Sequence, residues 1–87
     1  MKPGEEFIQQ GIEDLEKELE TVPSLLVSIG APKLRSIGLE IPANVFDSPA
    51  HRLYRLLQLS GSDSAHSRYN ALIRRLVSYE RATQCET

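Results

Sequence analysis

The apolar positions at the start of the chain predict an amphipathic helix over residues 4–21. Isoleucine and leucine recur there at steps of four and three residues, which places their side chains along one narrow stripe of a helix. We call this stripe the N-terminal seam; its members are Ile8, Ile12, Leu15 and Leu19. The remaining positions are mostly charged or polar, and the charges are mainly acidic. We therefore expect a long acidic helix that packs through one side only.

Prolines and glycines divide the middle of the chain. A proline opens and a glycine closes each of two predicted short helices, over residues 23–29 and 32–37. Proline suits the first turn of a helix because its missing N–H is not needed there, and glycine suits the left-handed residue that ends one. The stretch "LEIPANVFD" that follows has no regular period, so we expect a loop whose apolar side chains cover the core.

The last part of the chain predicts a helical hairpin over residues 49–82. Ser48 and Pro49 form a strong start signal, and Gly61 is expected to end the first helix. The four-three spacing then returns from Ala65 to Tyr79. It stops after residue 82, so residues 83–87 are predicted to be a loose tail. The fold class expected is all-α: a small bundle of about four to five helices with short connections punctuated by glycine and proline.

Size and composition predict one domain over residues 1–87. A chain of 87 residues with 40% apolar and 25% charged residues is typical of a small globular protein. A chain of this length has little core to spare for a deep catalytic pocket. With two Phe, three Tyr and no Trp, the core must consist mainly of aliphatic side chains.

Catalytic and metal-binding patterns are absent from the sequence. His51 and His66 have no partner at metal-ligand spacing, and Cys85 has no second cysteine. No nucleophile elbow or phosphate-binding loop occurs. We therefore expect no enzymatic activity and no cofactor. No apolar stretch approaches the ~20 residues that span a bilayer, and the first residues do not have the pattern of a secretory signal, so a cytoplasmic location is expected.

Charge divides the chain into two complementary halves. Residues 1–48 hold four basic and nine acidic side chains, a net of −5, whereas residues 49–87 hold six basic and three acidic ones, a net of +3. In a helix, Arg68 and Arg75 fall on one flank of the apolar face, and Arg74 and Arg81 fall on the opposite side. The basic surface is either a solvated face, paired in part with the acidic helix, or a site for an acidic partner. Its members are Arg52, Arg55, Arg68, Arg74, Arg75 and Arg81.

Two functions are compatible with these patterns. The first is a small cytoplasmic protein-binding regulator or adaptor that works as a homodimer, because a narrow seam on a charged helix suits contact with a partner. Its expected partner-binding residues are Phe7, Ile8, Ile12, Leu15 and Leu19. The alternative is a helix-turn-helix DNA-binding regulator, in which the last helix offers Ser64, Ser67, Arg68 and Asn70 to the major groove. The net charge of −2 for the whole chain favours the first function.

Overall fold

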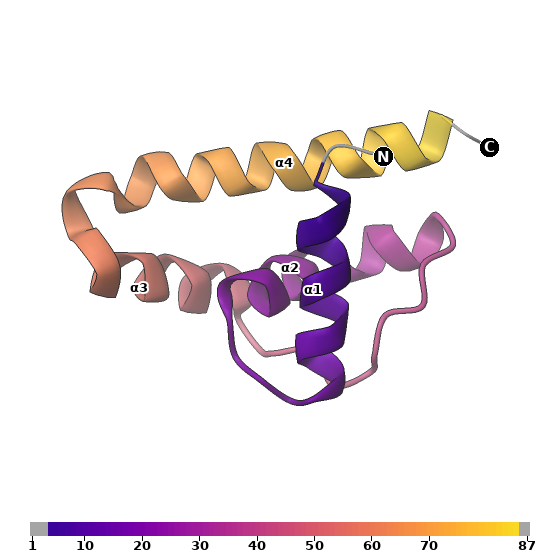
Figure 1. Ribbon diagram of the computed structural model, residues 1–87, viewed down its shortest axis with the longest axis horizontal. Coiled ribbons are helices and arrows are strands. Elements are labelled where there is room, and N and C mark those ends of the chain that lie inside the picture. Colours follow the sequence, from indigo (N-terminus) through magenta and orange to yellow (C-terminus); the bar gives the residue numbers. More distant parts are fainter. Residues whose placement is uncertain (1–3, 86–87) are drawn as a thin grey trace.

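The computed structural model describes residues 4–85, which form four α-helices and one turn of 3-10 helix. Figure 1 shows their arrangement. The described residues contain no strand, which confirms the all-α bundle. In chain order the elements are α1 (Glu5–Glu16), α2 (Val22–Ser36), α3 (Pro49–Gly61), the 3-10 turn η1 (Ser62–Ser64) and α4 (Ala65–Cys85).

Helix α2 lies at the centre of the bundle. It contacts the other three helices. In Figure 1, α2 passes behind α1, and α4 runs along the top of the view, above α3. Its sequence is apolar around much of its circumference, and Leu25, Leu26 and Val27 are all fully buried. A helix segment that is apolar on most sides is stable only when other helices surround it, and the exposed polar residues of α2 are confined to its last turn.

The core is aliphatic, as the composition predicts. Each helix contributes side chains to one continuous cluster, with a single ring, Tyr79, among its buried members. Aliphatic side chains such as those of leucine and valine pack closely between crossing helices, and they have no polar group that needs a hydrogen-bond partner, unlike those of tyrosine and tryptophan. The buried members are Ile8, Leu15, Leu25, Leu26, Val27, Leu34, Leu53, Leu57, Ala65, Leu76 and Tyr79.

Helix α1 is shorter than the sequence predicts and ends at Glu16 rather than near residue 21. Glu18 adopts the left-handed conformation, with φ 58. The Leu19 N–H donates to the Asp14 carbonyl over 2.8 Å, and the Glu18 N–H donates to the Leu15 carbonyl over 3.0 Å. This paired pattern is the Schellman motif that satisfies the last carbonyls of a helix. The apolar spacing does continue to Leu19, but that side chain lies beyond the helix end.

The two short helices predicted over residues 23–29 and 32–37 are one continuous helix, α2. Gly30 does not end it. A side chain at Gly30 would meet Leu76 of α4 at 2.9 Å, so this glycine permits a close helix crossing. Pro32 lies inside the helix, where it removes one backbone hydrogen bond without stopping the chain. Gly38, with φ 103, follows the helix end as the sequence predicts.

The C-terminal hairpin starts as predicted but extends further. Helix α3 begins at Pro49 and ends at Gly61, and α4 continues to Cys85 instead of ending near residue 82. Thr83 is only 8% exposed, because it lies four residues after Tyr79 and seven after Leu76 on the same buried face. The loose tail predicted over residues 83–87 is therefore wrong for residues 83–85, and residues 86–87 lie outside the described part of the chain.

Candidate functional site

Most of the N-terminal seam lies inside the subunit and cannot form the predicted partner surface. Ile8 is 1% exposed and Leu15 is 0% exposed, and Ile12 packs against the same core. A partner would have to unfold the bundle to reach Ile8 and Leu15. Leu19, in contrast, is 47% exposed. Phe7 is half-buried and faces α4. The seam therefore consists of internal core residues and one accessible end, Leu19, and Phe7 lies beside the seam.

One apolar groove lies where the four helices meet, and we call it the α4 groove. Its volume is about 370 Å³. One wall is a face of α4, because Arg68, Ala71, Leu72 and Arg75 are spaced by three, four and seven residues from the first. Leu57 of α3 is fully buried at its floor. The complete lining is Phe7, Val22, Pro23, Leu57, Arg68, Ala71, Leu72 and Arg75.

A glycine fixes the N-terminal wall of this groove. Gly4 precedes α1 with φ 74, and a side chain there would lie 2.8 Å from Cγ of Arg75 and 3.3 Å from the Arg75 carbonyl oxygen. The start of α1 can therefore lie directly against α4. As a result, the Arg75 guanidinium is held 5.7 Å from the centre of the Phe7 ring, within the range of a cation–π interaction.

The rim of the α4 groove carries two positive charges, those of Arg68 and Arg75. Arg68 donates from Nη1 to the Ser60 hydroxyl over 2.9 Å, and Arg75 lies over Phe7. Within residues 4–85, neither arginine forms an ion pair with a carboxylate. Both line the same groove, as expected for residues on one flank of the helix. The groove thus combines an apolar floor with a cationic rim.

A buried polar network holds the N-terminal end of α2, which supplies Val22 and Pro23 to the groove. Asp14 is 7% exposed, and its carboxylate accepts from Gln10 Nε2 over 2.9 Å and from the Thr21 hydroxyl over 2.6 Å. Thr21 is also the N-cap of α2. Its Oγ1 accepts from the Ser24 N–H over 3.2 Å, while its own N–H donates to Ser24 Oγ over 2.8 Å. This reciprocal capping box satisfies the first N–H groups of α2, and the hydrogen bond from Thr21 to Asp14 ties the start of α2 to the end of α1.

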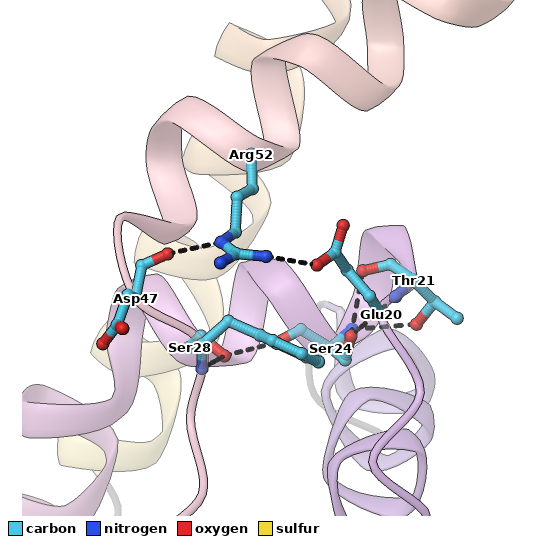
Figure 2. Close-up of polar contacts among 7 residues, drawn as sticks. Glu20, Thr21, Ser24, Ser28, Asp47 and Arg52 are labelled. Carbon is cyan, nitrogen blue, oxygen red and sulfur yellow. Dashed lines mark hydrogen bonds and ion pairs between the residues drawn. The ribbon is translucent and has the colours of Figure 1, made fainter.

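The network continues from α2 to the loop before α3 (Figure 2). The Ser28 hydroxyl donates to the Ser24 carbonyl over 2.8 Å and accepts from the Phe46 N–H over 3.3 Å. Asn44 of the same loop donates from Nδ2 to the Leu15 carbonyl over 2.9 Å. Buried polar groups are costly unless they are paired, so these contacts fix the loop in one arrangement.

The other predicted basic residues lie away from the α4 groove. Figure 2 shows Arg52 between Glu20 and Asp47: Nη1 is 2.6 Å from the Glu20 carboxylate, and Nε donates to the Asp47 carbonyl over 2.7 Å. This pair joins the basic hairpin to the acidic N-terminal half, although an exposed ion pair contributes little stability. Arg74 and Arg81 are exposed and do not line the α4 groove. The six arginines therefore form separate groups.

A second hollow beside α3 is charged with both signs. Its volume is about 390 Å³, and its aliphatic members include Leu59, which is 80% exposed. Arg52 is already paired with Glu20, so the hollow has no single charge to offer a ligand. The lining is Glu20, Asp47, Ser48, His51, Arg52, Arg55, Leu56 and Leu59.

Residues with catalytic or metal-binding chemistry are dispersed. His51 lies in the α3 hollow, whereas the ring of His66 is 3.2 Å from Asn70 Nδ2 on α4. Among residues 4–85, no three His, Cys, Asp or Glu side chains are placed to hold a metal ion. In the same residues, no helix has both the length and the apolar character needed to cross a bilayer.

The sequence matches no protein-family model, and no curated protein or solved structure is detectably similar to it.

Sequence reasoning identified the charges of the α4 groove and one apolar member of its lining, Phe7, but missed the rest of that lining. Leu72 and Val22 remain half-exposed because no helix covers this corner of the bundle. The spacing of Arg68, Ala71, Leu72 and Arg75 was the available signal, since it marks a mixed basic and apolar face.

Proposed function

We propose that the protein is a small cytoplasmic protein-binding regulator or adaptor, and that the α4 groove receives an acidic, amphipathic segment of its partner. The observation that carries this proposal is the apolar groove with Arg68 and Arg75 unbalanced at its rim. A partner segment with apolar side chains on one face and carboxylates beside them would bury the floor and neutralise the rim. An amphipathic helix in a groove is a common form of such recognition.

The shape of the hairpin supports a protein partner over DNA. In Figure 1, α4 turns back over α3. The Tyr54 ring of α3 and the Tyr69 ring of α4 meet edge to face. A helix-turn-helix instead sets its two helices at about 90–120°. Arg68 points back to Ser60, and an apolar floor has little to offer a phosphate backbone. Helix-turn-helix DNA binding remains the alternative function.

The proposed role requires neither a cofactor nor a catalytic group. Binding would instead depend on the buried apolar surface, at about 25 cal/mol per Å², and on charge complementarity at the rim. The free thiol of Cys85 is exposed, which supports placing the protein in a reducing compartment such as the cytoplasm.

A synthetic peptide tests this function directly. The probe is a helix-forming peptide of about 15 residues with leucines along one face and glutamates elsewhere, long enough for about four turns. We expect fluorescence anisotropy to detect binding, and Ala71→Glu to weaken it at least about tenfold by placing a carboxylate in the groove. Ala71 is exposed, so the variant should remain folded.

Two controls define the result. Ser78→Glu adds the same charge to an exposed site of α4 outside the groove and should leave peptide binding unchanged. A peptide with lysine in place of glutamate should not bind. Equal binding to wild type and Ala71→Glu, or no binding at all, would contradict the proposal. Micromolar binding to duplex DNA at physiological salt, lost in Arg68→Ala or Arg74→Ala, would establish the alternative instead.

A further inference from the structure

The turn after α1 presents one leucine to solvent among acidic side chains. We call residues 16–20 the Leu19 turn, and all five are exposed. Among residues 4–85, Leu19 and Leu59 are the large apolar side chains that are exposed to solvent. The Schellman hydrogen bonds at the end of α1 hold this turn in shape. The carboxylates of Glu16 and Glu18 have no partner among residues 4–85. Lys17 is paired with Glu13, over 3.1 Å.

The chemistry of the Leu19 turn is complementary to that of the α4 groove. The turn offers an apolar side chain flanked by carboxylates without an ion pair, and the groove offers an apolar floor flanked by guanidinium groups that contact Ser60 and Phe7 but no carboxylate within residues 4–85. We propose that the Leu19 turn of one copy docks into the α4 groove of a second copy, forming a homodimer. Leu19 would contact Leu72 in the groove, while Glu16 and Glu18 would lie near its rim. This inference rests on the proposed function, because it names one occupant of the same groove.

The positions of the two surfaces favour a closed dimer. The groove includes Val22, which follows Leu19 by three residues, so the turn and the groove adjoin each other at the start of α2. A two-fold axis near this point would let each copy provide one turn and one groove. The same contact would then form twice, and the assembly would close at two subunits.

This arrangement has a regulatory consequence. A groove filled by the Leu19 turn of a second copy is closed to a partner segment, so dimerisation and partner binding compete. A partner that occupies the groove would release monomers by mass action. The dimer would thus be the storage form and the partner complex the active form.

Sedimentation velocity over about 1–500 μM tests the dimer. We expect wild type to show a concentration-dependent monomer–dimer equilibrium, and Leu19→Asp to raise the dimer dissociation constant at least about tenfold. Leu59→Asp is the control, because Leu59 is also an exposed leucine and does not line the α4 groove, and this variant should dimerise like wild type. Circular dichroism should show that both variants remain folded.

A mixing experiment identifies the contacting surfaces. Leu19→Asp retains an intact groove, and Ala71→Glu retains an intact turn, so each variant alone should be monomeric at concentrations where wild type is dimeric. Mixed together, they should form a heterodimer through the one intact turn and the one intact groove. A monomeric wild type, or dimerisation of both variants at the wild-type level, would overturn the inference.

The peptide experiment separates failure of the dimer from failure of the proposed function. If wild type is monomeric but still binds the acidic peptide through the groove, the self-docking inference fails and the proposed function stands. If Leu19→Asp and Ala71→Glu abolish the dimer but the acidic peptide never binds, the proposed function fails and the dimer stands. If wild type dimerises through these surfaces and also binds the acidic peptide in the groove, adding peptide should dissociate the wild-type dimer.

Discussion

The α1–α2 junction and the α3–α4 hairpin are packed in different ways. At the first, Gly11 lets the two helix backbones approach so closely that an added side chain would lie 2.4 Å from the Pro23 carbonyl oxygen. At the second, side chains separate the helices, and the Tyr54 and Tyr69 ring centres are 5.8 Å apart. Backbone contact leaves no room for adjustment, whereas side chains can change rotamer. The first junction should therefore tolerate substitution far less than the second.

This difference suits the proposed groove. The rigid junction fixes Val22 and Pro23 at one edge, and the hairpin supplies Ala71 and Leu72 from a helix face that is still partly open to solvent. A recognition site works best when rigid elements hold its contact residues in place. Substitutions on α4 can thus alter the groove surface without changing the junction that supports it.

The largest expected effect is at Gly11. We expect Gly11→Ala to lower the free energy of unfolding by about 3 kcal/mol or more, because the new methyl group meets both the Pro23 carbonyl and Val27 Cγ2 at 2.4 Å. Tyr69→Leu in the hairpin should cost less than about 2 kcal/mol. Urea unfolding of both variants, with Gln9→Ala as an exposed control on α1, measures the contrast. Equal losses would refute the difference between the junctions.

A smaller effect is expected at Asp14. Asp14→Ala should lower the free energy of unfolding by about 2 kcal/mol, because the Thr21 hydroxyl and the Gln10 amide lose their shared buried acceptor. Asp63→Ala, an exposed position in the hairpin turn, should have almost no effect. A double-mutant cycle with Thr21→Val should give a coupling energy above about 0.5 kcal/mol. Additive losses would show that the network does not act as a unit.

Glu18 offers a stabilising substitution in the same region. We expect Glu18→Gly to raise the free energy of unfolding by up to about 1 kcal/mol, because glycine adopts φ 58 without the side-chain clash that glutamate incurs. Lys17 has φ −91, so Lys17→Gly should instead destabilise the helix end. Thermal unfolding of the two variants provides the comparison. A lower melting temperature for Glu18→Gly would contradict this account of the turn.

The smallest expected effect is a pH dependence where α4 meets α2. Burial raises the pKa of Glu80 above its ordinary value of 4.5, and the nearby charge of Lys33 opposes this by lowering the pKa. The folded state therefore holds the Glu80 proton more tightly than the unfolded state. Its stabilising contribution is complete below the unfolded pKa and is lost as pH rises through the raised folded pKa.

Glu80→Gln isolates this contribution. The variant should show a weaker decline in stability from pH 4.5 upward than wild type, and at neutral pH it should be more stable by less than about 1 kcal/mol. Urea unfolding at several pH values, with the exposed Glu40→Gln as control, measures the change. A wild-type slope that persists in Glu80→Gln would assign the dependence to another group.

The sequence determined the all-α class, the aliphatic core and several helix ends. Pro49 begins α3 and Gly38 follows the end of α2, because proline and glycine restrict or free the backbone locally. The positions of Arg68 and Arg75 on one flank of α4 also followed from helical geometry alone. These features depend on residues close together in the chain, so the sequence contains enough information to predict them.

Only the tertiary structure decided how the helices meet. Periodicity reports which side chains favour burial, but it does not report how closely two backbones approach or which distant group satisfies a polar atom. The sequence predicts that Gly30 ends a helix, yet Gly30 lies inside one at a close crossing, and the close crossing at Gly11 has no signal in the sequence. Asp14 looks like a surface acid, yet it is buried with Thr21. The spacing of residues on α4 indicates one wall of the α4 groove, but the groove as a whole could not be predicted, because it exists only where four separate helices leave a corner uncovered.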